Sequence, residues 1–237
     1  MIGVVLQFIK MVLLMPLLII LKIYDKKYNP TCALYGIEGY FGLMGQGKTI
    51  AMSKRLLDLR KKYGDSIYIT TNYYFKGEDF HFEDWHQLLG NFDKPLVVAW
   101  DEVQNEFSSR NFKDFPIELL TQLTQVRKNN GILVLYTAQR FARVDKIFRE
   151  LSCYMYECKT YLGRFTIVKK YDCDDYAQRC NSVSVDNKIK IHPLDSYSFI
   201  QRKKHRDCYD SYQMLESAKN KVYMDRTELA QIDFSRL

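Results

Sequence analysis

The chain has 237 residues, of which 47% are hydrophobic, so it can bury one α/β core of ordinary size plus a modest appendage. We therefore expect one principal domain and not a series of them. The formal net charge of +7, from 35 basic and 28 acidic residues, is compatible with a nucleic acid or an anionic membrane as partner but is too small to establish either.

The N-terminus begins with an apolar run from Ile2 to Leu21, close to the ~20 residues that a helix needs to span a bilayer. We predict a transmembrane or membrane-anchor helix at residues 1–23 and a polar linker at residues 24–32. A cleaved secretion signal is disfavoured, because no basic residue precedes the run.

Basic residues that directly follow the run predict the topology of the chain. By the positive-inside tendency they hold the C-terminal side in the cytoplasm, which predicts a single-pass protein of the inner (cytoplasmic) membrane with its main domain inside the cell. These residues are Lys22, Lys26 and Lys27. Because Lys10 and Pro16 interrupt the run, the alternative is an interfacial helix or a helix packed against a partner.

A phosphate-binding loop follows the first predicted strand at residues 33–41. Gly42 to Thr49 read Gly-Leu-Met-Gly-Gln-Gly-Lys-Thr, the complete G-x-x-x-x-G-K-[ST] pattern between a strand-like and a helix-like run. Glycines let the backbone curl so that its N–H groups face the phosphates, and the helix that follows directs its positive end at the same anion. A glycine turn before an ordinary helix is the alternative. The predicted ATP-contacting residues are Gly42, Gly45, Gln46, Gly47, Lys48, Thr49 and Ile50.

The last two residues of the pattern supply the polar chemistry. The Lys48 ammonium would reach the β- and γ-phosphates, and the Thr49 hydroxyl would ligate Mg²⁺. The sequence therefore predicts ATP and Mg²⁺ as cofactors.

The helix predicted at residues 50–63 is followed by a second strand at residues 66–75. Basic residues line the helix and aromatic residues follow the strand, and each group has an ordinary interpretation, as a solvated face or as the cover of a sheet end. The alternative is contact with nucleic acid, in which the aromatic rings would stack on single-stranded bases. The basic residues are Lys54, Arg55, Arg60, Lys61 and Lys62, and the aromatic ones are Tyr73, Tyr74, Phe75, Phe80, Phe82 and Trp85.

A third strand ends in two acids. Pro95 to Glu102 is a short apolar run closed by Asp101 and Glu102, as expected of a central parallel strand buried on both faces. Ligands bind at the carboxyl end of such strands. Asp101 would hold the magnesium through its water shell, and Glu102 would polarise the water that attacks the γ-phosphate. Taken alone, the pair is equally compatible with a solvated turn or a helix cap.

Three further elements complete the predicted ATPase domain at residues 33–172. A helix at residues 117–129 precedes a fourth buried strand at residues 132–139, and two alternating runs at residues 153–159 and 164–171 predict a hairpin at the sheet edge. Strands that alternate with helices indicate a mainly parallel, doubly wound sheet, so the fold class is an α/β P-loop NTPase.

Residues 173–237 are polar and poorly periodic, and we predict a tail or partner-binding segment there. Six cysteines lack the tight C-x-x-C spacing of structural zinc sites, and an ATP site implies a reducing compartment, so we interpret them as free thiols. A metal cluster is the alternative for four of them, Cys153, Cys158, Cys173 and Cys180.

The stretch from Trp100 to Leu151 resembles a known family. Asp101-Glu-Val-Gln-Asn-Glu-Phe-Ser-Ser-Arg110, Gln125-Val-Arg-Lys-Asn-Asn-Gly131, Thr137-Ala-Gln139 and Val144-Asp-Lys-Ile-Phe-Arg149 are similar to segments of the zonular occludens toxin-like proteins. These are the assembly ATPases of filamentous phages, within the FtsK/HerA group of P-loop ATPases. The resemblance covers roughly residues 35–171.

The resemblance implies further catalytic residues beside Lys48 and Glu102. Gln139 would sense the γ-phosphate or orient the attacking water. An arginine finger would reach a neighbouring subunit's nucleotide, which requires a homo-oligomeric ring; an ordinary surface ion pair is the alternative for each arginine. The candidates for the finger are Arg110, Arg127 and Arg149.

We therefore expect a membrane-anchored ATPase of a phage or mobile element that couples ATP hydrolysis to DNA packaging or translocation, or to virion assembly and export. Its partners would be single- or double-stranded DNA, the membrane, further copies of the chain, and phage structural or assembly proteins. The alternatives are a plasmid or conjugative DNA-transfer ATPase, and a membrane-tethered nucleotide-binding adaptor with little turnover. A nucleotide kinase is disfavoured, because no substrate lid or second cluster of phosphate-binding arginines is evident.

Overall fold

The computed structural model describes residues 2–28, 34–107, 116–127, 130–181 and 189–209. The chain divides into two compact units, residues 1–33 and residues 34–237. In the first unit, helix α1 runs from Ile2 to Tyr28 and contains Pro16. Among the described residues no helix combines the length and the apolar character needed to cross a membrane, so the transmembrane helix predicted at residues 1–23 is not supported.

The second unit contains the remaining helices and all the strands. The helices are α2 (Lys48–Tyr63), α3 (Ile117–Thr124), α4 (Lys146–Leu151), α5 (Cys173–Asn181) and α6 (Lys203–Arg206). The strands are β1 (Gly36–Phe41), β2 (Tyr68–Thr71), β3 (Phe80–His81), β4 (Leu96–Trp100), β5 (Ile132–Ala138), β6 (Tyr154–Tyr161), β7 (Phe165–Asp172) and β8 (Asp195–Ile200).

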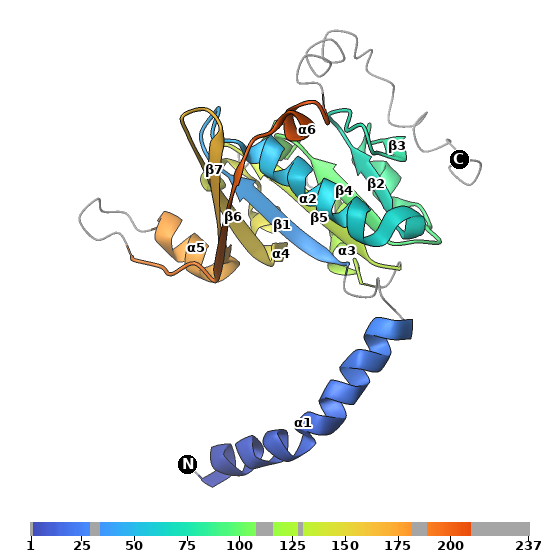
Figure 1. Cartoon of the computed structure of the whole chain (residues 1–237), viewed down its shortest axis with the longest axis vertical. Coiled ribbons are helices and arrows are strands. Elements are labelled where there is room, and N and C mark those ends of the chain that lie inside the picture. Colours follow the sequence, from blue (N-terminus) through green and yellow to red (C-terminus); the bar gives the residue numbers. More distant parts are fainter. Residues whose placement is uncertain (1, 29–33, 108–115, 128–129, 182–188, 210–237) are drawn as a thin grey trace. The chain divides into compact units, whose positions relative to one another are not determined.

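A single mixed sheet organises this unit, in the order β3-β2-β4-β5-β1-β6-β7-β8 (Figure 1). Strands β1 to β6 pair in parallel, and β7 and β8 add two antiparallel pairings at one side. The mainly parallel α/β fold predicted from the alternation of strands and helices is thus confirmed. Because β5 lies between β4 and β1, the ends of these three strands meet at one edge of the sheet.

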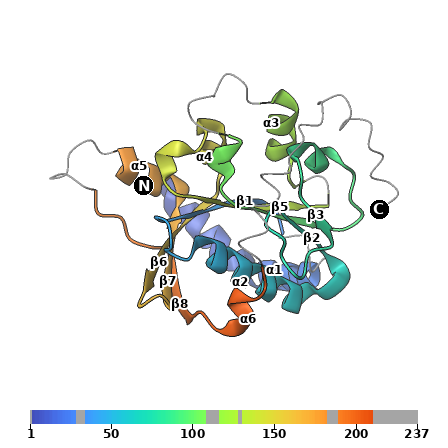
Figure 2. The ribbon, with the colours of Figure 1, turned by 90° about the horizontal axis from the view of Figure 1, so that it is seen from above.

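Helices cover both faces of the sheet, as the view from above shows (Figure 2). Helices α2 and α6 lie on one face, and α3, α4 and α5 lie on the other. Two apolar clusters correspond to these layers: Leu56 of α2 packs with Val97 of β4, and Phe148 of α4 packs with Trp100. The strands between the two layers are buried on both sides, which explains why β4 and β5 are almost wholly apolar.

The aromatic residues after the second strand mostly belong to the core. Tyr73, Phe75 and Phe82 are buried, and Phe82 packs edge-on against Trp100 with ring centroids 4.8 Å apart. The ordinary interpretation, that these rings cover the end of the sheet, therefore accounts for them. Arg60 from the basic helix is also structural, because it forms an ion pair with Asp79.

The C-terminal segment differs from the predicted tail. Strand β8 pairs with β7, for example Val168 opposite Tyr197, and α6 follows it against α2. The folded unit therefore extends past the predicted boundary at residue 172, and the β6–β7 hairpin is not the sheet edge. The segment is polar because β8 is the last strand of the sheet, where only Phe199 of its residues is fully buried.

Candidate nucleotide site

The phosphate loop lies between the end of β1 and the start of α2, where its sequence pattern placed it. Gly47 adopts a left-handed backbone conformation with φ 79°, and a side chain there would come within 2.6 Å of the Thr160 hydroxyl oxygen. At Gly42 a side chain would come within 2.8 Å of the Cys158 carbonyl oxygen. The two pattern glycines are thus required by conformation and by close packing against β6.

Polar contacts hold the loop in place. The Gln46 side-chain oxygen accepts a hydrogen bond from the Thr160 backbone N–H at 2.9 Å, which ties the loop to β6. Lys48 is buried, and its Nζ lies 3.4 Å from the Leu43 carbonyl oxygen and 3.8 Å from Glu102 Oε1. The buried ammonium is therefore held at the centre of the loop, between its backbone and the acidic strand.

Asp101 lies beside the loop because of the sheet register. Trp100 pairs with Tyr136, so the next residues, Asp101 and Thr137, lie side by side. The Thr137 hydroxyl donates to Asp101 Oδ1 at 2.5 Å, and the Thr49 hydroxyl donates to Oδ1 and Oδ2 at 3.0 and 3.2 Å. Burial raises the pKa of Asp101, while the two hydroxyl donors oppose the rise.

The Thr49–Asp101 pair fits a magnesium ion. A hydroxyl and a carboxylate are hard oxygen donors, which Mg²⁺ prefers, and the ion usually takes its other ligands from water and substrate phosphates. Asp101 is buried, whereas Thr49 is half-buried and also lines the cavity beside the loop. Within the described ranges no group of three or more His, Cys, Asp or Glu residues could hold a metal by itself.

Glu102 occupies a strained backbone conformation next to the buried lysine. Its φ and ψ of 54° and 47° are left-handed, which is uncommon for a residue with a long side chain. Its backbone N–H donates to the Thr137 hydroxyl oxygen at 2.9 Å, and its carboxylate accepts hydrogen bonds from the side chains of Gln104 and Gln139. The strain is therefore balanced by contacts that direct the carboxylate toward Lys48.

Gln139 follows β5 and reaches the same carboxylate, with Nε2 at 3.3 Å from Glu102 Oε2. Phe41 at the end of β1 pairs with Ala138, so Gln139 lies level with the start of the phosphate loop. The structure thus brings together the residues that sequence reasoning placed on three separate strands. They are Lys48, Thr49, Asp101, Glu102 and Gln139.

Of the three predicted finger arginines, the two that the structure describes lie away from this group. Arg110 lies outside the described residues. Arg127 lies at the other end of the sheet, over the ring of Tyr35 just before β1, and Arg149 on α4 lies over the ring of Phe141. Arg143, which the sequence analysis did not single out, contacts a member of the group, because it donates to Gln139 Oε1 at 3.3 Å. Its position four residues after Gln139 was the only signal available.

Two other predicted nucleotide contacts, Gly45 and Ile50, line a cavity of about 300 Å³ beside the loop. The opposite wall comes from the C-terminal segment that was predicted to be a tail, with Gln201, Arg206 and Tyr209. Of these residues only Arg206 stands out in the sequence, as part of a basic run at residues 202–206, and the path of β8 brings all three to the loop.

The five described cysteines do not line the cavity beside the loop. Cys153, Cys158, Cys173, Cys180 and Cys208 are free thiols, as predicted, and Cys32 lies outside the described residues. Burial raises the pKa of Cys158 to about 12 and that of Cys173 to about 11, which keeps both as thiols at neutral pH.

The comparison with known proteins supports the fold. No family model and no curated protein matches the chain. Among solved structures it is similar to the N-terminal domain of zonular occludens toxin from Neisseria meningitidis, with 20% identity and a TM-score of 0.52 over 75% of this chain and 100% of that one. It is also similar to the genome packaging NTPase B204 from Sulfolobus turreted icosahedral virus 2 in complex with ATP-gammaS, with 11% identity and a TM-score of 0.43 over 59% and 93% of the two chains.

The first of these similarities confirms, at the level of the fold, the resemblance stated from the sequence. The domain of the Neisseria toxin is matched over its whole length. The chain therefore has the fold of that toxin domain, with a phosphate loop and an acidic strand in place.

Proposed function

We propose that the protein is a Mg²⁺-dependent ATPase of a phage or mobile element, which couples ATP hydrolysis to DNA packaging or translocation, or to virion assembly and export. One observation carries the enzymatic part of the proposal. Lys48, Asp101 and Glu102 converge from a loop and a strand far apart in the sequence, and Gln139 contacts the same carboxylate from the strand between them. A structural role alone does not require a strained glutamate beside a buried lysine.

Each residue has a defined task in this proposal. Backbone N–H groups of the loop and the Lys48 ammonium bind the phosphates, and Thr49 and Asp101 hold Mg²⁺, which neutralises charge on the phosphates when it is bound. The Glu102 carboxylate accepts a proton from the attacking water, and Gln139 orients that water from the adjacent strand end. The contacts of Lys48 with Leu43 and Glu102 would give way to contacts with phosphate.

The coupling to DNA rests on the sequence resemblance over residues 100–151, and the net charge of +7 is compatible with it. An assembly with other phage proteins as partners rests on the same resemblance. In a homo-oligomeric ring a neighbour's arginine would complete the site, and Arg110, Arg127 and Arg149 remain the candidates that the resemblance indicates.

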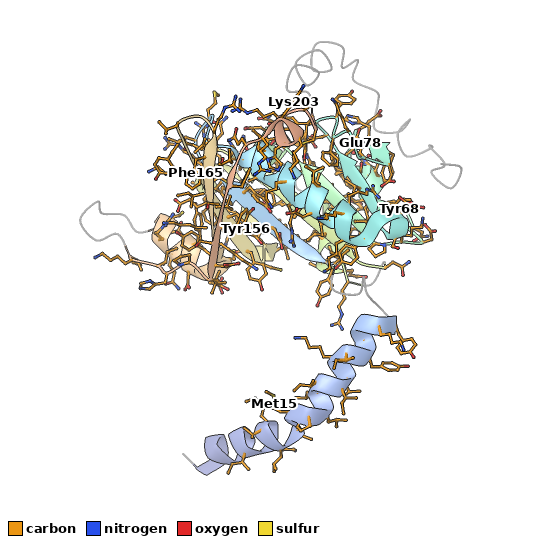
Figure 3. The ribbon with its side chains drawn as sticks, viewed as in Figure 1. Met15, Tyr68, Glu78, Tyr156, Phe165 and Lys203 are labelled. Atoms are coloured by element: carbon orange, nitrogen blue, oxygen red, sulfur yellow. The ribbon has the colours of Figure 1, made fainter. Side chains whose placement is uncertain are left out.

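Attachment to the cytoplasmic membrane, with the ATPase domain in the cytoplasm, is a separate proposal. It rests on α1, whose apolar side chains are exposed, for example Leu13 at 75% and Met15 at 47% (Figure 3). Lysines at positions 22 and 27 would face the anionic lipid surface. Flotation of the full chain with anionic vesicles in a density gradient tests this proposal. The unaltered protein should float with the vesicles, and the protein in which serine replaces Leu13 and Leu17 should stay at the bottom of the gradient.

The coupling proposal is tested by ATP turnover of the full chain with and without single- and double-stranded DNA, with Lys48→Ala as the blank. We expect one form of DNA to stimulate turnover and the Lys48→Ala protein to show no turnover with either. Turnover that responds to neither DNA form would overturn the DNA part and favour an assembly ATPase that acts on protein. Nucleotide binding without turnover would favour the tethered adaptor.

A further inference from the structure

The C-terminal segment forms one wall of the cavity beside the phosphate loop. After β8, the Gln201 backbone N–H donates to the Arg164 carbonyl oxygen at 2.8 Å, and α6 then packs against α2 on the same face of the sheet (Figure 2). The cavity of about 300 Å³ has Gly47, Thr49 and Ile50 on one side and Arg206 and Tyr209 on the other. A segment remote in sequence is thus built into the proposed ATP site.

The residues of the cavity identify which part of a nucleotide it would hold. The γ-phosphate end of the site is marked by Asp101, Glu102 and Gln139, and none of these lines the cavity. Lys48 and Thr49 belong to both regions, because Lys48 lies 3.8 Å from Glu102, Thr49 bonds to Asp101, and both also line the cavity. Beyond these two residues the lining includes Ile50 in the first turn of α2 and Arg206 and Tyr209 of the C-terminal segment. It therefore lies where the α-phosphate, ribose and base would extend from the loop.

Arg206 brings a positive charge to this cavity without a carboxylate partner in the described part of the chain. Its Nη2 donates to the Gly163 carbonyl oxygen at 2.6 Å and to Gln201 Oε1 at 3.0 Å, and its Nε donates to the same Oε1 at 3.3 Å. Both acceptors are neutral oxygens, so these bonds fix the guanidinium without cancelling its charge. An arginine fixed in this way is suited to bind phosphate, which accepts two of its N–H groups at once.

Gln201 connects Arg206 to the phosphate loop. Its side chain is buried, and Nε2 donates to the Thr166 hydroxyl oxygen at 2.9 Å, while Oε1 holds Arg206. A side chain at Gly47 would come within 3.3 Å of the same Nε2. Gln201 therefore sets the position of the guanidinium relative to the loop.

Tyr209 supplies an aromatic surface at the outer end of the cavity. Its ring packs edge-on against the buried ring of Tyr73, with centroids 5.5 Å apart, and the residue lines the cavity with Arg206. An aromatic ring supported from behind offers a surface on which a nucleotide base can stack.

We propose that Arg206 is a nucleotide-binding residue that contacts the α-phosphate of ATP or ADP in the same subunit, with Gln201 as its positioning residue and Tyr209 as the surface for the base. This inference rests on the proposed ATP binding and assigns a role in it to the C-terminal segment. It also explains why β8 and α6 are folded onto the sheet instead of leaving it as a tail.

The test is the affinity of the full-length protein for a fluorescent ADP analogue, with inorganic tripolyphosphate as a competitor. Arg206→Gln keeps a donor for the Gly163 carbonyl oxygen but removes the positive charge. It should weaken the binding of ADP about tenfold or more, and it should also weaken the binding of tripolyphosphate. Tyr209→Leu should weaken the binding of ADP but not the binding of tripolyphosphate, because tripolyphosphate has no base. Lys203→Ala is the control, because Lys203 lies on the same helix but does not line the cavity (Figure 3).

The outcomes separate this inference from the proposed function. If the unaltered protein binds ADP and hydrolyses ATP while Arg206→Gln and Arg206→Ala bind ADP equally well, only the role of Arg206 is overturned. If the unaltered protein binds no nucleotide, the proposed function fails and the inference fails with it. A melting temperature that collapses in both Arg206 variants would assign Arg206 to the fold and would also overturn the inference.

Discussion

The carboxyl group of Asp101 illustrates how single residues are tuned at this site. Burial raises its pKa, and the hydroxyls of Thr137 and Thr49 lower it again. A carboxyl with a pKa above its unfolded value binds more protons in the folded state, so its contribution to stability falls as the pH rises through that range. Magnesium binding has the opposite requirement, since the metal needs the carboxylate.

Thr137→Val should therefore move the acid limb of the pH–rate profile to higher pH. The substitution removes the donor at 2.5 Å from Asp101 Oδ1, and a lost hydrogen bond of ~1 kcal/mol corresponds to about fivefold lower turnover on that limb. The measurement is kcat for ATP between pH 5 and 8 at saturating Mg²⁺.

Thr70→Val is the matched control for this prediction. Thr70 is also buried in a strand, but its hydroxyl has no hydrogen-bond partner among the described residues. Its profile should coincide with that of the unaltered protein. An acid limb that stays in place in Thr137→Val would contradict the role assigned to the Thr137 hydroxyl.

Site residues that belong to a recognisable sequence motif could be predicted from the sequence. Site residues outside such a motif could not. The glycines of the loop, Lys48 and the acid pair follow from spacing and from the strand that precedes them. Arg143 was not singled out, and Arg206 stood out only as part of the basic run at residues 202–206. The places of both depend on a partner that is set by the fold: Gln139 for Arg143 and Gly163 for Arg206.

At the scale of elements, the end of α2 is fastened to the sheet by Arg60. Its guanidinium donates to the carbonyl oxygens of Gly64, Ile67 and Gly77 and to Asp79. These bonds join the end of α2 to β2 and to the segment before β3. Because α2 begins at the phosphate loop, its anchoring also holds the loop.

Arg60→Ala should lower the free energy of unfolding by about 2–3 kcal/mol, since it leaves a carboxylate and backbone carbonyls without a charged donor. The measurement is denaturant unfolding. Lys61→Ala, at the next and exposed position of the same helix, should change stability by less than about 0.5 kcal/mol. Equal stabilities of the two variants would show that the Arg60 bonds contribute nothing.

Elements buried on both faces were predicted closely, and peripheral ones were not. The predicted strand at residues 132–139 is β5 at Ile132–Ala138, because a continuous apolar run leaves little choice. The helix predicted to reach residue 129 ends at Thr124. Strand β8 was missed, although Tyr197 and Phe199 alternate with serines, since one such pair in a polar segment is a weak signal.

At the scale of the whole molecule, the unit that contains the sheet is larger than the sequence pattern implied. The parallel part of the sheet brings the phosphate loop, the acid pair and Gln139 to one edge, and the antiparallel part brings β8 and α6 back to that edge. Parts predicted to be separate, a catalytic domain and a tail, thus share one site.

The central claim is that Glu102 promotes the attack of water on ATP held by the phosphate loop. The most direct test compares ATP binding and ATP turnover in the unaltered protein, in Glu102→Gln and in Glu118→Gln, an exposed glutamate of α3. We expect Glu102→Gln to bind ATP as tightly as the unaltered protein while kcat falls by about 10²–10⁴-fold, and Glu118→Gln to change neither quantity. A Glu102→Gln protein that hydrolyses ATP at the normal rate would contradict the account.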